Sequence, residues 1–257
     1  MSAVEERSSE EGVRGLALSP RLVWPWLAIV AALISLAGLG AELLGHAIGL
    51  PLDQGVVPYL SLSNEANVPT YFSAALLASC SVLLTIAAQA ARAAREKRAW
   101  SWWVLAAGFA LMSVDEAIEI HEHLAFFRTG GVLYFSWVIP AGVLVLVLGV
   151  GFLRFLRDLP AATRWRFVGA GALYVLGAVG LELPLGAWTE RFGNESLGYA
   201  LIDWCEESLE IGALILFLHA LFRHLASAGV HVRFVSDGAK GPAREHIPSS
   251  NDSSNGA

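Results

Sequence analysis

Long apolar runs alternate with short polar segments along the whole chain. Six of these runs are long enough to cross a bilayer, which takes roughly 20 residues of helix. No segment alternates with a period of two, as the strands of a membrane β-barrel do. The pattern therefore predicts an all-α, polytopic membrane bundle of six transmembrane helices, at residues 22–45, 68–91, 100–124, 132–153, 166–187 and 199–222.

The composition favours the same class. Of the 257 residues, 55% are hydrophobic and 16% are charged, whereas soluble domains average about 25% charged residues. The mean hydropathy is +0.56. The polar ends, residues 1–21 and 225–257, are expected to be disordered cytoplasmic tails, which leaves residues 22–224 as the transmembrane domain. No nucleic-acid-binding motif is present, so nucleic acid is not an expected partner.

The basic residues predict the orientation. All of the 17 Lys and Arg residues except Arg128 and Arg191 fall in the tails, in the loops after the second and fourth spans, or at the span ends beside them. Short segments rich in Lys and Arg remain in the cytoplasm. We therefore expect both termini to be cytoplasmic, and the Ala-rich, Arg-over-Lys composition favours a bacterial inner (plasma) membrane. Aromatic residues near the span ends, among them Tyr134, Trp137 and Tyr199, fit interfacial belts.

Acidic residues gather in the outer halves of these spans. The sequence SVDEAIEIHEHL, residues 113–124, ends the third span, and residues 203–210 begin the last span with the spacing D-x-x-E-E-x-x-E. At 100° per residue, the acids of each segment share one helix face, which in the third span includes His123 but not His121. Glu42 and His46 stack at i, i+4 in the first span. We expect these faces to meet inside the bundle. The acids within the spans are Glu42, Asp115, Glu116, Glu119, Glu122, Glu182, Asp203, Glu206, Glu207 and Glu210.

The energetic cost of this arrangement requires compensation. Ten ionised carboxylates without partners would cost on the order of 20 kcal/mol inside a bilayer. No Lys or Arg lies in the interior of a span to offset that cost. Protons, water, a bound metal ion or a cationic ligand must therefore do so.

The first hypothesis is a divalent metal site. Inward-facing Glu and His on helical bundles hold iron, manganese or zinc. The protein would then be a membrane metalloenzyme, a hydrolase or oxidase acting on a lipid-like or apolar substrate, with Asp115 and Glu207 as catalytic residues. The candidate metal ligands are Glu119, His123, Glu206, Glu210, Glu42 and His46, supported by Glu116, Glu122, Glu182, Asp203 and Glu65.

Two alternatives remain open. The same acids suit a proton- or cation-coupled transporter or channel, although the inner halves of the spans offer no continuing polar path. They also suit a non-catalytic membrane interaction protein whose acids line a water-filled vestibule. Membrane lipid is the expected partner in each case.

Three motifs carry a resemblance to a known group of proteins. They are E-x-N-x-P-T-Y-F-S (residues 65–73), S-V-D-E-x-x-x-x-H-E (113–122) and E-E-x-x-E (206–210). In the first motif, Asn67 and Pro69 form a helix-start signal, and Glu65 lies beside the expected polar site. Over spans two to six the chain resembles an uncharacterised family of bacterial multi-pass membrane proteins. This resemblance implies a shared polar site and no particular reaction.

Overall fold

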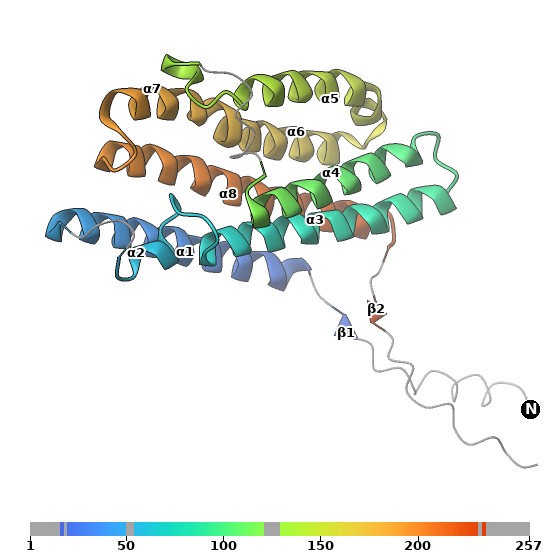
Figure 1. Ribbon diagram of the computed structural model, residues 1–257. Coiled ribbons are helices and arrows are strands. Elements are labelled where there is room, and N and C mark those ends of the chain that lie inside the picture. Colours follow the sequence, from blue (N-terminus) through green and yellow to red (C-terminus); the bar gives the residue numbers. More distant parts are fainter. Residues whose placement is uncertain (1–15, 18–19, 50–53, 121–128, 231–232, 235–257) are drawn as a thin grey trace, which may run out of the picture. The chain divides into compact units, whose positions relative to one another are not determined.

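The computed structural model describes residues 16–17, 20–49, 54–120, 129–230 and 233–234, which are mostly helical (Figure 1). Within this part of the chain, six helical segments are long and apolar enough to span a membrane, which confirms the predicted all-α bundle. The elements in chain order are β1 (Leu16–Ala17), α1 (Pro20–Ile48), α2 (Val57–Leu60), α3 (Val68–Ala93), α4 (Ala99–Ile118), the 3₁₀ turn η1 (Gly131–Leu133), α5 (Val138–Asp158), α6 (Ala161–Val175), the π-helical η2 (Leu176–Leu181), α7 (Glu182–Phe192), α8 (Leu197–Ser227) and β2 (Arg233–Phe234). The six spans are α1, α3, α4, α5, the continuous run of α6, η2 and α7, and α8.

The outward face of the bundle is apolar, as lipid requires. Along α5, Val143, Leu146 and Val150 are large hydrophobic residues that lie exposed on the molecular surface. In water such a surface would drive association, whereas acyl chains solvate it. Together with the six spans, this surface indicates a multi-pass integral membrane protein.

Helix α8 is the central element of the bundle. It contacts α1, α3, α6, η2 and α7, while α3 also pairs with α4. Small residues let α3 and α4 approach closely, and hydroxyl groups join them. The Ser113 hydroxyl donates to the Ala74 carbonyl over 2.8 Å, and the Ser81 hydroxyl donates to the Ala106 carbonyl over 2.8 Å.

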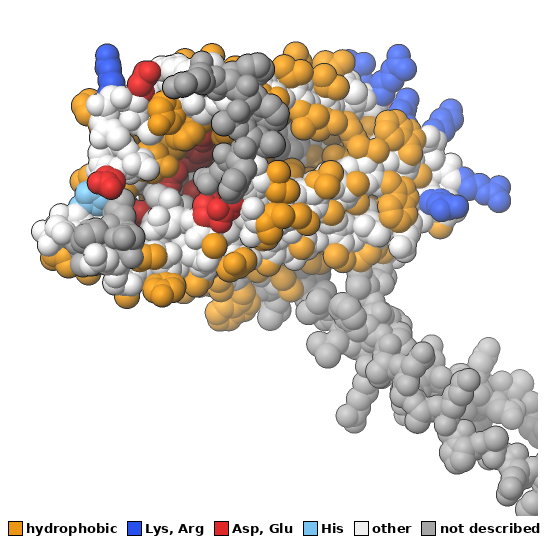
Figure 2. Space-filling view, in the orientation of Figure 1, with side chains coloured by type: hydrophobic (Ala, Val, Ile, Leu, Met, Phe, Trp, Pro, Cys, Tyr) orange, Lys and Arg blue, Asp and Glu red, His pale blue; other side chains and the backbone are white. Residues whose placement is uncertain are grey.

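One end of the bundle, termed the basic end, carries the α3–α4 and α5–α6 turns and most of the Lys and Arg side chains visible in Figure 2. Its interior is a packed hydrophobic core. Trp102 is only 1% exposed, and its ring meets those of Phe155 at 4.9 Å, Phe167 at 6.0 Å and His224 at 4.8 Å. These rings tie α4 to α5, α6 and α8.

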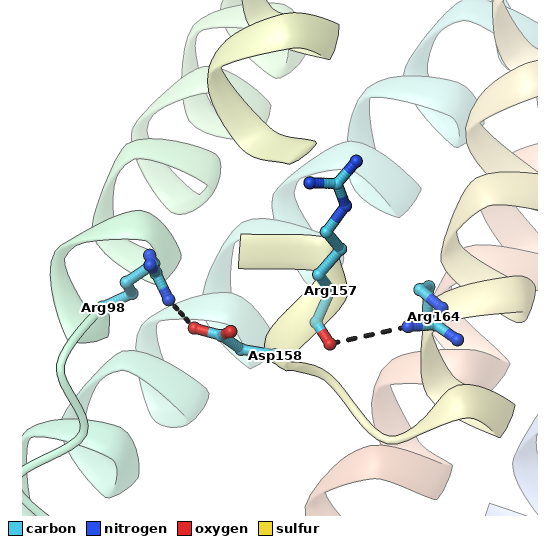
Figure 3. A network of polar contacts seen from close by, with 4 residues as sticks. All are labelled: Arg98, Arg157, Asp158 and Arg164. Carbon is cyan, nitrogen blue, oxygen red and sulfur yellow. Dashed lines mark hydrogen bonds and ion pairs between the residues drawn. The ribbon is translucent and has the colours of Figure 1, made fainter. Parts of the chain in front are cut away.

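Polar contacts close the basic end at its surface (Figure 3). Arg98, just before α4, forms an ion pair with Asp158 at the end of α5. Arg164 of α6 donates to the Arg157 carbonyl over 3.5 Å. Both side chains of the ion pair are partly exposed, so the pair adds little free energy and mainly aligns the two helix ends.

The third span is shorter than the sequence predicts. Helix α4 ends at Ile118 and not at residue 124, because Glu119 adopts a left-handed conformation with φ of 59°. Its backbone N–H donates to the Asp115 carbonyl over 2.7 Å and so closes the last turn. His123, the expected i, i+4 partner of Glu119, lies outside the described residues.

The start of α3 confirms the predicted signal. Asn67 is the N-cap residue, and its side chain accepts hydrogen bonds from the Thr70 backbone N–H and hydroxyl, each over 3.1 Å. Pro69 lies in the first turn. The Asn67 amide also donates to the Ser61 and Asn64 carbonyls, each over 2.7 Å, so one side chain fixes both the helix start and the preceding loop.

A short strand pair is separate from the bundle, which comprises residues 18–231. Strands β1 and β2 pair in antiparallel fashion, with Leu16 opposite Phe234 and Ala17 opposite Arg233. These four residues belong to the two segments for which the sequence predicts tails.

The core at the basic end gives a first test. Replacing Trp102 by Ala removes a ring that contacts three other rings and leaves a cavity, so we expect a loss of about 3 kcal/mol in the free energy of unfolding. Thermal unfolding in detergent, followed by far-UV circular dichroism, measures this loss. Trp103→Ala is the matched control, because Trp103 is 40% exposed. Equal midpoints for the two variants would contradict the assigned core.

Candidate functional site

A cavity of about 600 Å³ lies in the half of the bundle opposite the basic end. Its walls come from α4, α5, α6, η2, α7 and α8, and from the segments that precede α3 and α5. Figure 2 shows acidic side chains inside a hollow on the side of the bundle. Among the described residues that line the cavity, none is Lys, Arg or His, and eight are acidic: Glu65, Asp115, Glu116, Glu182, Asp203, Glu206, Glu207 and Glu210.

Helix α8 supplies half of these carboxylates. Asp203, Glu206, Glu207 and Glu210 are three or four residues apart and therefore lie on one helix face. Glu206 is the most enclosed of them, with 5% of its surface exposed, and its Oε2 atom is buried without a hydrogen bond to any described residue. A buried carboxylate oxygen without a donor is costly, so this atom favours a ligand inside the cavity.

Acids from other helices face this group. The Glu182 carboxylate, at the start of α7, lies within side-chain hydrogen-bonding reach of Glu206. It also accepts a hydrogen bond from the indole N–H of Trp137 over 3.3 Å. From α4, Glu116 is close enough to interact electrostatically with Glu207 and Glu210. Carboxylates from α4, α7 and α8 thus repel one another across a small space when ionised.

Aromatic side chains form part of the same lining. Tyr134, Trp137 and Tyr199, which the sequence predicts for interfacial belts near the span ends, all line the cavity. Tyr174 also lines it, with its hydroxyl beside the Glu210 carboxylate. Sequence reasoning missed Tyr174. Its position in the middle of a predicted span was the available signal, because a tyrosine there does not reach the membrane interface and its hydroxyl needs a polar partner inside the bundle.

A π-helical segment brings one wall close to α8. Helix α6 widens into η2 directly opposite the acids, and single π-turns inside α-helices are frequent at functional sites. Gly177 in this segment has no side chain, and a Cβ atom there would lie 2.8 Å from Cγ of Glu210 and 3.1 Å from the Glu206 carbonyl oxygen. A glycine is therefore required for this close approach.

Glu42 and His46 lie in a different place from the cavity. Glu42 is 2% exposed, and its Oε1 atom accepts a hydrogen bond from the Ser61 hydroxyl. His46 contacts two backbone oxygens, that of Glu42 at 3.0 Å and that of Glu195 at 3.2 Å. This pair joins α1 to the loop before α3 and to the α7–α8 turn, so the expectation that it contributes to the acidic site is not met in the described structure.

The remaining candidate ligands divide into two groups. Glu119 ends α4 and does not line the cavity. Glu122 and His123 lie outside the described residues. Within the described ranges, no group of three or more His, Cys, Asp or Glu side chains is arranged to hold a metal ion.

Fold and cavity together define a class: a six-span integral membrane protein with an acid-lined cavity in one half of its bundle. Residues 26–225 match the family described as "Domain of unknown function (DUF8692)", and the chain belongs to this family. The match extends from α1 to α8 and so includes the whole cavity. No curated protein and no solved structure matches the chain.

The close approach at Gly177 gives a second test. Gly177→Ala places a methyl group against Glu210 and the α8 backbone, so we expect a loss of about 1–3 kcal/mol in the free energy of unfolding. Gly171→Ala on α6 is the matched control, because a Cβ atom there meets nothing within 4 Å. In a helix interior this control should gain up to about 1 kcal/mol. Chemical denaturation of both variants measures the difference, and identical stabilities would show that η2 and α8 are not in close contact at Gly177.

Proposed function

We propose that this protein binds a cation inside the acid-lined cavity of its transmembrane bundle. The observation that supports this most directly is the buried Oε2 atom of Glu206, one of the eight acidic residues that line the cavity. A cation at this point would supply the missing partner and reduce the repulsion among Glu206, Glu207 and Glu210. Ionisable residues inside a membrane commonly mark the path or site of an ion or substrate.

A divalent metal ion is one form that the cation could take. Carboxylate oxygens are hard donors that suit manganese and magnesium better than softer metals. The described residues alone do not present a metal-binding group, and the candidate ligand His123 lies outside the described residues. In a metal-loaded form, Asp115 or Glu207 would be positioned to act as a general base.

The basic half of the bundle favours a binding site over an open pore. Phe109 stacks on Phe217 at a ring distance of 4.9 Å, and Phe217 meets Phe167 at 4.8 Å. These rings belong to the packed core that begins about two helical turns beyond Glu210 on α8. Transport would therefore require this aromatic layer to separate, as in alternating access.

Cation binding predicts a stabilisation that depends on Glu206. Protein in nanodiscs is titrated separately with MnCl₂, ZnCl₂, MgCl₂ and methylamine hydrochloride at constant ionic strength, and Tm is measured. At about 100 times Kd, a bound cation adds about 2.7 kcal/mol, which should raise Tm by roughly 5–10 °C. Glu206→Gln should abolish this rise while keeping a Tm at least equal to that of the wild type, because removal of one like charge relieves repulsion.

Glu96→Gln is the matched control, since Glu96 is exposed in the α3–α4 turn at the basic end. This variant should respond to cations like the wild type. The proposal fails if none of the four cations stabilises the wild-type protein, or if the Glu206→Gln variant responds equally.

A further inference from the structure

The cavity has two chemically different kinds of wall. Carboxylates come from α8 and α4, whereas α5 and η2 contribute only apolar side chains to the lining, among them Leu144, Val145, Ala178 and Val179. An inorganic ion uses the first kind of wall alone. A ligand that matches both walls carries a positive charge and an apolar body.

The size of the cavity also favours a molecule over an ion. A volume of about 600 Å³ is within the range of small-molecule pockets, about 300–1,000 Å³, whereas a water molecule occupies about 30 Å³ of liquid. Pockets of this kind are mostly apolar, with a few polar groups that fix orientation. The cavity meets this description at α5 and η2.

Helix α5 connects the cavity to the lipid-facing surface. Leu144 is 57% exposed and Val145 is 36% exposed, and both line the cavity, while their neighbours Val143 and Leu146 are exposed large hydrophobic residues of the same helix. Figure 2, which views the bundle from its side, shows hydrophobic side chains beside the hollow that contains the acids. The apolar part of a ligand in this cavity would therefore lie next to the acyl-chain region of the membrane.

Aromatic side chains complete the match to an organic cation. Trp137, which is hydrogen-bonded to Glu182, and Tyr134 and Tyr199 share the lining with the carboxylates. Ring faces attract ammonium groups, most strongly where water is excluded. Carboxylates and rings together select an amine over a hydrated metal ion.

We propose that the ligand is an amphipathic organic cation of the alkylamine type. Its ammonium group binds among Glu206, Glu207 and Glu210, and its apolar chain lies along α5 and η2. This inference rests on the cation-binding function proposed above and adds the chemical class of the ligand.

Isothermal titration calorimetry on protein in phosphatidylcholine nanodiscs, with empty nanodiscs as the baseline, tests the class. The probes are hexylamine, methylamine, hexanol and MnCl₂ at pH 7. Each methylene moved from water to an apolar wall tightens binding roughly fourfold, so we expect hexylamine to bind at least tenfold more tightly than methylamine. Hexanol, which has the chain without the charge, should show no binding above the baseline.

Two variants test the binding of the apolar chain and of the ammonium group separately. Val145→Thr keeps the side-chain shape but places a hydroxyl group in the apolar wall. It should therefore lower the affinity for hexylamine at least threefold and leave the affinity for methylamine unchanged. Glu206→Gln should abolish the binding of both amines.

Failure of the amphipathic-amine proposal can be distinguished from failure of the cation site. Equal affinities for hexylamine and methylamine, or Mn²⁺ binding that neither amine displaces, would overturn the amphipathic amine and leave the cation site intact. Binding of hexanol as tight as that of hexylamine, or no binding of any of the four probes, would overturn the cation site itself.

Discussion

Mutual repulsion among carboxylates inside an apolar bundle is the constraint on which the rest of this structure depends. Charges that are close together and shielded from water interact far more strongly than charges at a surface. Four of the eight acids, Asp203, Glu206, Glu207 and Glu210, lie on the central helix α8, which also holds the bundle together. The structure therefore has to stabilise α8 by contacts that lie outside the acidic half.

The basic half provides those contacts. Trp102, Phe155, Phe167 and Phe217 pack in a continuous core that joins α4, α5, α6 and α8. Because lipid solvates apolar side chains as well as protein does, helix association in a membrane relies on close packing, and this core supplies it. One half of the bundle gives stability, and the other half can keep an acidic cavity. Such a division is typical of proteins that retain a destabilising functional site.

Unusual backbone conformations border the cavity on several sides. Ala66, next to Glu65, has φ of 54°, and Glu119, at the end of the helix that carries Asp115, has φ of 59°. Left-handed conformations are unfavourable for residues other than glycine and tend to persist at functional sites. The π-helical η2 adds a third irregularity opposite α8. Two residues in the left-handed region and one π-helical segment thus border the cavity.

The local patterns of the sequence were sufficient for the fold. Twenty-residue apolar runs define spans regardless of their neighbours, since each helix satisfies its own backbone hydrogen bonds in lipid. The same periodicity placed Asp203, Glu206, Glu207 and Glu210 on one face of α8, and Asn67 with Pro69 marked the start of α3. These features depend on residues close together in the chain.

Tertiary structure decided which of these residues meet. Glu42 and His46 have suitable i, i+4 spacing, yet the rotation of α1 directs them to Ser61 and the α7–α8 turn. Tyr174 was missed in the sequence and becomes part of the site because Gly177 lets η2, which continues α6, approach α8 closely. A sequence pattern fixes the face of a helix on which a side chain lies, but the neighbour of that face is set by packing between helices, which depends on residues far apart in the chain.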